Sequence, residues 1–127
     1  MSVTVSELLD LAKDLREKST EACLRGSISR AYYAAFHQAD AWHQTLPSAG
    51  KPPDKTGGKH HDLACRLSTP TLPTVDPRRA LSVKAGYILR ESHRVRVKAD
   101  YYLSDTITIS EADQLLISAQ KIVTSLS

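Results

Sequence analysis

Three polar side chains near position 96 are spaced so that a helix would bring them together. His93, Arg96 and Asp100 are three and four residues apart and would share one helical face. Arginine binds phosphate through paired hydrogen bonds, and histidine transfers protons near neutral pH. Such a face could bind an RNA phosphate through Arg96, move a proton through His93 and orient either group through Asp100. The alternative is a local Arg96–Asp100 ion pair beside a solvated His93.

A second set of polar residues shows the same spacing about sixty residues earlier. Arg30, Tyr33 and His37 also step by three and four, away from the apolar seam of their own segment. If the two segments are helices that pack side by side, both faces would line one cleft, and Asp100 would hold Arg30. The alternative is a buried polar network that fixes helix register, with Tyr32 and Tyr33 as packing residues.

Basic residues are concentrated around the first of these faces. Residues 78–98 contain seven lysines and arginines and one acid, Glu91, which gives this stretch a net charge of 7 − 1 = +6. Within it, Arg90, Arg94 and Lys98 form a stripe beside the Arg96 face. A basic stripe is the electrostatic footprint of a polyanion, so these residues are candidates for binding RNA. The alternative is a solvated helix face whose charges pair with acids from elsewhere in the fold.

The elements that must position these residues are helical. Apolar residues recur at intervals of three and four in five segments, with loop chemistry at 47–58 and 69–77, and no segment alternates with period two for long. We expect helices over 3–18, 20–45, 59–68, 77–104 and from 111 onward. Expected N-caps are Thr4 or Ser6, Asp76, and Ser110 with Asp113 three residues later. The prediction is an all-α, four- to five-helix up-and-down bundle in one domain, 1–127.

Composition excludes several other classes of protein. The chain has 127 residues and a net charge of +3, with no apolar run near the ~18 residues of a membrane span. Its first residues lack the pattern of a signal peptide, so we expect a cytoplasmic protein with free thiols at Cys23 and Cys65. Adjacent histidines such as His60 and His61 do not point the same way. Neither a metal site nor a glycine-rich phosphate loop is indicated, so no cofactor is expected.

Two segments together resemble a known family. They are Ser27–His37 (SISRAYYAAFH) and Arg96–Tyr101 (RVKADY), with Lys59–Leu63 (KHHDL) between them at a loop-to-helix junction. This combination looks like the small HEPN-domain proteins of bacteria and archaea, and the order of all the helices agrees. The resemblance implies a helical bundle that forms a homodimer. Tyr101 is then a candidate for RNA contact, and for modification by a partner.

The same resemblance sets the functional expectation. Many family members are metal-independent ribonucleases, and many small ones are toxins paired with a minimal nucleotidyltransferase antitoxin. Their signature is Arg, four to six residues, then His. Here Asp100 stands where active nucleases tend to have His, while Arg30 and His37 match the spacing in another helix. We therefore expect an RNA-interacting protein, a ribonuclease toxin or defence component. The alternative is a non-catalytic module that binds a nucleotidyltransferase partner or serves in dimerisation.

Overall fold

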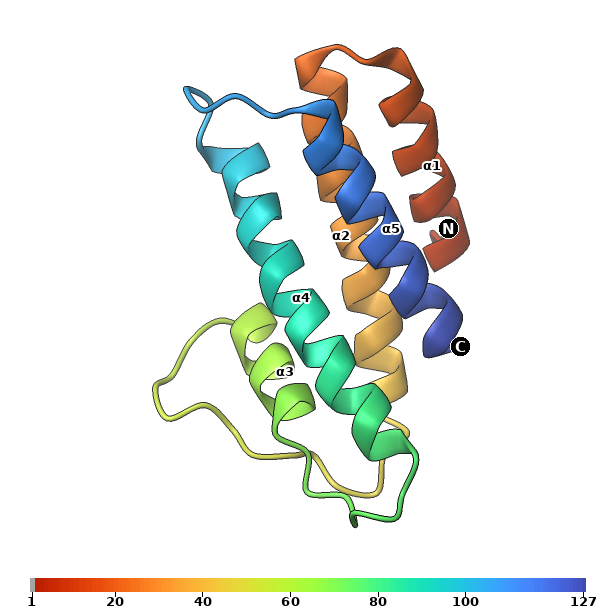
Figure 1. The fold of residues 1–127 in the computed structure, drawn as a ribbon, viewed down its shortest axis with the longest axis vertical. Helices are drawn as coiled ribbons and strands as arrows, with labels where there is room; N and C mark the ends of the chain where they lie inside the picture. The colour runs from red at the N-terminus through yellow and green to blue at the C-terminus, as the bar shows by residue number, and fades with distance from the viewer. Residues whose placement is uncertain (1) are drawn as a thin grey trace.

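Five α-helices make up the regular structure of this chain. The computed structural model describes residues 2–127 and contains, within that range, helices and no strands, as the all-α prediction required (Figure 1). The helix bounds are α1 Val5–Lys18, α2 Glu21–His43, α3 Lys59–Ser68, α4 Arg78–Tyr101 and α5 Ile109–Ser125.

Helices α1, α2, α4 and α5 form an up-and-down bundle, and α3 lies against the outer side of α4 (Figure 1). Helix α2 is central and contacts α1, α4 and α5. Its buried face is rich in alanine, with Ala31, Ala34, Ala35 and Ala39 all essentially inaccessible. Small side chains let the neighbouring helix backbones approach closely, so α2 can be enclosed on several sides.

Capping residues explain where α1 and α5 begin. Thr4 and Glu7 form a reciprocal capping box at the start of α1, as expected. At α5, however, the N-cap is Thr108, whose box partner is Glu111, so the predicted Ser110 cap is wrong. Asp113, the expected partner of Ser110, instead forms an ion pair with Arg16 of α1.

The two ends of α4 are held by charged side chains. Asp76 accepts a hydrogen bond from the Arg78 backbone N–H (2.9 Å), although Pro77 rather than Asp76 is the N-cap residue. At the other end, the Arg25 guanidinium of α2 donates to carbonyls around the C-terminus of α4, including those of Ala99 (2.9 Å) and Tyr102 (3.2 Å). The helix therefore ends at Tyr101, a few residues before the expected end.

A close backbone approach fixes α3 on α4. A Cβ atom at Gly86 would lie 2.5 Å from the Ser68 backbone nitrogen and 2.9 Å from the Ala64 carbonyl oxygen, so only glycine fits there. Beside it, the buried Ser82 hydroxyl donates to the Leu67 carbonyl oxygen at 2.7 Å. These contacts determine where the first turn of α3, with its histidines, sits relative to α2 and α4.

Candidate functional site

Six ring side chains gather where α2, α3 and α4 meet. We call them the histidine–tyrosine cluster: Tyr32, Tyr33, Phe36 and His37 from α2, His60 from α3, and His93 from α4. Their rings lie within 4.4 to 6.4 Å of one another in nine neighbouring pairs. Three helices from distant parts of the chain thus bring three histidines to one place.

His60 and His93 stack on each other within this cluster. Their ring centroids are 5.2 Å apart and the planes differ by 16°. His60 also lies against Phe36, at 4.4 Å between centroids, and its Nδ1 atom is 2.8 Å from the hydroxyl of Tyr32. Tyr32 is buried, with 1% of its surface exposed, so the position of the His60 ring is set by the bundle core.

The electrostatic surroundings keep both stacked imidazoles neutral at neutral pH. Burial lowers the pKa of His60, and the neighbouring His93 and Arg96 lower it further. Burial and then Arg96 lower the pKa of His93 in the same way. Burial raises the pKa of Tyr32, so its phenol keeps its proton and can donate to His60. Neutral imidazole is the form that accepts a proton, so the cluster holds candidate bases.

Arg96 supplies a cation at the edge of the cluster. Its Nη2 atom donates to the Tyr33 hydroxyl at 2.7 Å, and its Cζ atom lies 5.1 Å from the Tyr33 ring centroid. Its Nε atom is 2.7 Å from Asp100 Oδ2, an ion pair in which the buried Nε–H is not aligned for a hydrogen bond. The Arg96 side chain is only 11% exposed, and the Nη1 group makes no hydrogen bond within residues 2–127.

The predicted face of α4, with His93, Arg96 and Asp100, combines features of both interpretations given above. Arg96 and Asp100 make the local i,i+4 pair that was the alternative interpretation. His93 is partly buried against Tyr32 and is not a solvated residue. The Ser29 hydroxyl, at 3.5 Å, is a second partner of Asp100.

Of the predicted set on α2, Tyr33 and His37 belong to the same site and Arg30 does not. Tyr33 meets Arg96, and His37 stacks on Tyr33 with ring centroids 6.2 Å apart, so the two faces do share one cluster. Arg30 does not take part: it is exposed, and Asp100 pairs with Arg96 in its place. The expected Arg30–Asp100 contact is therefore absent from residues 2–127. His37 is exposed, so it is the histidine of the cluster most open to a ligand.

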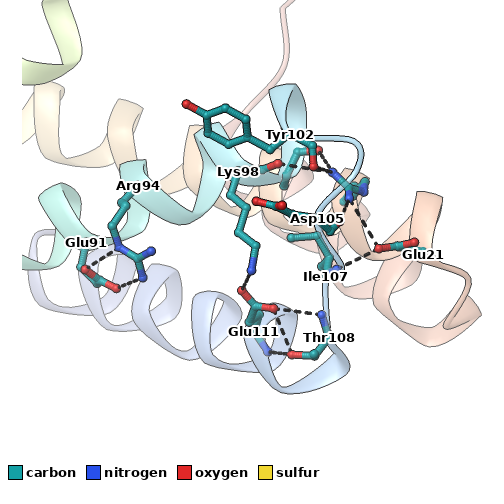
Figure 2. Close-up of polar contacts among 11 residues, drawn as sticks. Glu21, Glu91, Arg94, Lys98, Tyr102, Asp105, Ile107, Thr108 and Glu111 are labelled. Atoms are coloured by element: carbon teal, nitrogen blue, oxygen red, sulfur yellow. Dashed lines mark hydrogen bonds and ion pairs between the residues drawn. The ribbon is translucent and has the colours of Figure 1, made fainter.

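The basic stripe is divided between two sides of α4. Arg94 pairs with Glu91 of its own helix (2.6 Å), and Lys98 pairs with Glu111 of α5 (2.9 Å), as Figure 2 shows. Arg90 turns towards α3, where its Nη2 atom donates to the Ser68 hydroxyl at 3.3 Å. Two of the three cations are thus paired with acids, but only Lys98 pairs with an acid from elsewhere in the fold, as the alternative interpretation of the charge run required.

Tyr101 is the remaining predicted RNA contact. Its side chain is 67% exposed, and its ring centroid lies 5.8 Å from Cζ of Arg96. The ring is therefore accessible beside the cation and is available to stack on a base.

His60 is the site residue that the sequence prediction did not place among the catalytic candidates. The signal for it was present. His60 precedes Leu63, Ala64 and Leu67 by three, four and seven residues, so it shares the buried face of α3. His61 falls outside that face and is exposed.

Other kinds of site find no support in the described part of the chain. Residues 2–127 hold no group of three histidine, cysteine or acidic side chains arranged for a metal ion. None of their helices is long and apolar enough to cross a membrane. No protein-family model, curated protein or solved structure matches this sequence.

Proposed function

We propose that this chain is an RNA-interacting protein of the HEPN type and acts as a metal-independent ribonuclease. One observation carries the proposal. Two histidines with lowered pKa values, His60 and His93, stack at 5.2 Å beside the Arg96 guanidinium. A neutral base next to a cation is the combination that RNA transesterification needs. The family motifs around Tyr33 and Arg96 point to the same substrate.

The proposed reaction assigns one role to each group. The free Nη1 group of Arg96 binds a non-bridging oxygen of the phosphate. His93, whose ring makes no hydrogen bond within the described residues, accepts the proton of the RNA 2′-hydroxyl. The 2′-oxygen then bonds to phosphorus, and the bond from phosphorus to the 5′-oxygen breaks. His37, which is exposed and stacks on Tyr33, donates a proton to that leaving oxygen.

Two further residues hold this arrangement in place. His60 stacks on His93 and is itself oriented by the Tyr32 hydroxyl. Asp100 orients Arg96. The products are a 2′,3′-cyclic phosphate and a 5′-hydroxyl, and no metal enters any step. The assembly proposed with it is the one that the family resemblance implies: a homodimer, acting as a toxin beside a minimal nucleotidyltransferase antitoxin. Its proposed location is the cytoplasm.

A second candidate function rests on Asp100. Its carboxylate lies 2.7 Å from Arg96 Nε and neutralises the cation that a phosphate would need. This contact favours a non-catalytic module that binds a nucleotidyltransferase partner, RNA or a second copy of itself. In that case the histidine–tyrosine cluster serves to fix the packing of α2, α3 and α4.

Cleavage of RNA in EDTA distinguishes the two functions. The purified full chain is incubated with total tRNA, alongside His93→Gln, Arg96→Gln and Asp100→Asn variants. A ribonuclease loses on the order of 10²-fold or more in rate when the base or the phosphate-binding cation is removed. Lys13→Gln is the matched control, because it removes one exposed positive charge from α1, outside the cluster. It should cleave at the wild-type rate.

The remaining outcomes are equally informative. Each variant's thermal unfolding is measured first, so that loss of fold is not taken for loss of chemistry. No cleavage by the wild type, together with tighter RNA binding by Asp100→Asn, would favour the binding module. Equal cleavage by wild type and His93→Gln would refute the proposed base.

A further inference from the structure

A second group of reactive side chains consists of Cys65 and His61 of α3 and Arg90 of α4. The thiol of Cys65 is 3.6 Å from Nε2 and 3.9 Å from Nδ1 of His61, one helical turn earlier. The Nη2 atom of Arg90, from α4, lies 4.0 Å from the same sulfur. A proton acceptor and a cation thus contact one cysteine that is partly exposed.

These side chains line a groove rather than a flat surface. The groove has a volume of about 500 Å³ and lies between α3 and the loop that precedes it. Its lining includes three basic residues, Lys51, Lys55 and Arg90, against one acid, Asp54. A groove of this charge favours an anionic ligand next to the thiol.

The wall of the groove is held in place by specific contacts. The Lys51 backbone N–H donates to the Thr69 carbonyl oxygen at 2.9 Å, and the Thr69 hydroxyl donates back to the Lys51 carbonyl oxygen at 3.1 Å. Gly50 adopts φ +77°, and a Cβ there would lie 2.2 Å from the Arg66 carbonyl oxygen. The loop is therefore tied to the C-terminal end of α3, where Cys65 lies.

His61 is positioned by glycine. A Cβ at Gly57 would lie 2.7 Å from Cδ2 of the His61 ring, so the ring packs directly on the loop backbone. The imidazole is thereby kept between the loop and Cys65. A Cβ at position 57 would displace the ring, so glycine there allows His61 to keep this orientation.

We propose that Cys65 is a modification site that forms a mixed disulfide with small anionic disulfides. The thiolate is the nucleophile in such an exchange, and it forms where a base takes the proton and a cation lies beside the sulfur. His61 takes the proton of Cys65. The sulfur then attacks one sulfur of the incoming disulfide, the S–S bond breaks, and the departing thiolate takes the proton from His61. One disulfide is consumed and one is formed, so no other oxidant is needed.

Charge determines which disulfide reacts. Lys51, Lys55 and Arg90 attract carboxylates on the incoming molecule, so a peptide disulfide that carries several carboxylates is favoured over a neutral or cationic one. Cys23 is the internal control. It is also partly exposed, but its thiol makes no hydrogen bond within residues 2–127. The inference does not depend on the function proposed above.

The test uses the reduced full chain and three disulfides of different charge. Oxidised glutathione is the anionic probe, hydroxyethyl disulfide the neutral one and cystamine the cationic one. Adducts at Cys65 and Cys23 are timed at pH 7 by intact mass and peptide mapping. We expect Cys65 to react with oxidised glutathione at least about tenfold faster than Cys23. His61→Gln should slow Cys65 alone, and Arg90→Gln should reduce its preference for the anionic probe.

Three results would overturn the proposal. They are equal rates at the two cysteines, an unchanged Cys65 rate in His61→Gln, and faster reaction of Cys65 with cystamine than with glutathione. His61 is exposed, so its substitution leaves the fold intact, and an unchanged unfolding midpoint checks this. Gly57→Ala provides an independent variant, because it displaces the His61 ring without removing the imidazole, and it should also slow Cys65.

Discussion

The free energy of unfolding should decrease as the pH is lowered from 7.5 to 5.5, because of two histidines. His60 and His93 have pKa values below their usual 6.5 in the folded chain, mainly through burial. As the pH falls, a group whose pKa is lower in the folded chain than in the unfolded chain binds its proton first in the unfolded chain. Its stabilising contribution is therefore complete above pH 6.5 and is lost as the pH falls through the folded pKa.

The size of the effect follows from the linkage relation. Each histidine that is neutral when folded and protonated when unfolded contributes about 1.4 kcal/mol per pH unit. If both rings stayed neutral, the loss from pH 7.5 to 5.5 would approach ~2.7 kcal/mol. Protonation of the folded chain and solvent screening of these partly buried rings make the loss smaller than this limit. Carboxylates with shifted pKa values, such as Glu111 and Asp113, titrate below this window and do not contribute.

The assay is urea unfolding at several pH values, followed by circular dichroism. The double variant His60→Gln/His93→Gln should lose most of the pH response between 7.5 and 5.5. The His43→Gln variant changes a histidine at the end of α2, outside the cluster, and should keep the wild-type response. If the double variant showed the same dependence as the wild type, the two imidazoles would not have lowered pKa values, and the assignment of His93 as a neutral base would fail.

Two further predictions concern packing and charge. Gly86→Ala should lower the free energy of unfolding in urea by about 2 kcal/mol, because its Cβ would meet the backbone nitrogen of Ser68 at 2.5 Å; an unchanged midpoint would mean that α3 can shift. In RNA titrations at increasing salt, Arg90→Gln should reduce the slope of log affinity against log salt by about 0.7, whereas Lys98→Gln, which removes a charge already paired with Glu111, should change it less. The reverse order would show that the Lys98 side of α4 faces the RNA.

Local sequence signals were sufficient to predict the helices. The bounds of α3 agree with the prediction at both ends, because a loop rich in glycine and lysine precedes the helix and prolines follow it. The start of α5 was ambiguous, since Thr108–Glu111 and Ser110–Asp113 both match a capping pattern. The structure uses the Thr108–Glu111 pair, while Asp113 pairs with Arg16, 97 residues away in the chain.

The candidate site was predictable only where its residues lie on one helix. Periodicity put His93, Arg96 and Asp100 on one face, and they do lie together. Periodicity could not show that Asp100 pairs with Arg96 rather than with Arg30. Nor could it show that Lys98 pairs with an acid of α5, because both contacts depend on how the helices pack. The same holds for His60, whose neighbours come from two other helices.

The ends of the RNA fragments distinguish metal-independent cleavage through the 2′-hydroxyl from other reactions. The wild-type chain is incubated in EDTA with an RNA oligonucleotide, and with the same oligonucleotide carrying a 2′-deoxy sugar at the cleaved position. We expect fragments ending in a 2′,3′-cyclic phosphate and a 5′-hydroxyl, and no cleavage at the 2′-deoxy position. Cleavage that persists at that position, or that requires added metal, would contradict a reaction in which His93 activates the 2′-hydroxyl.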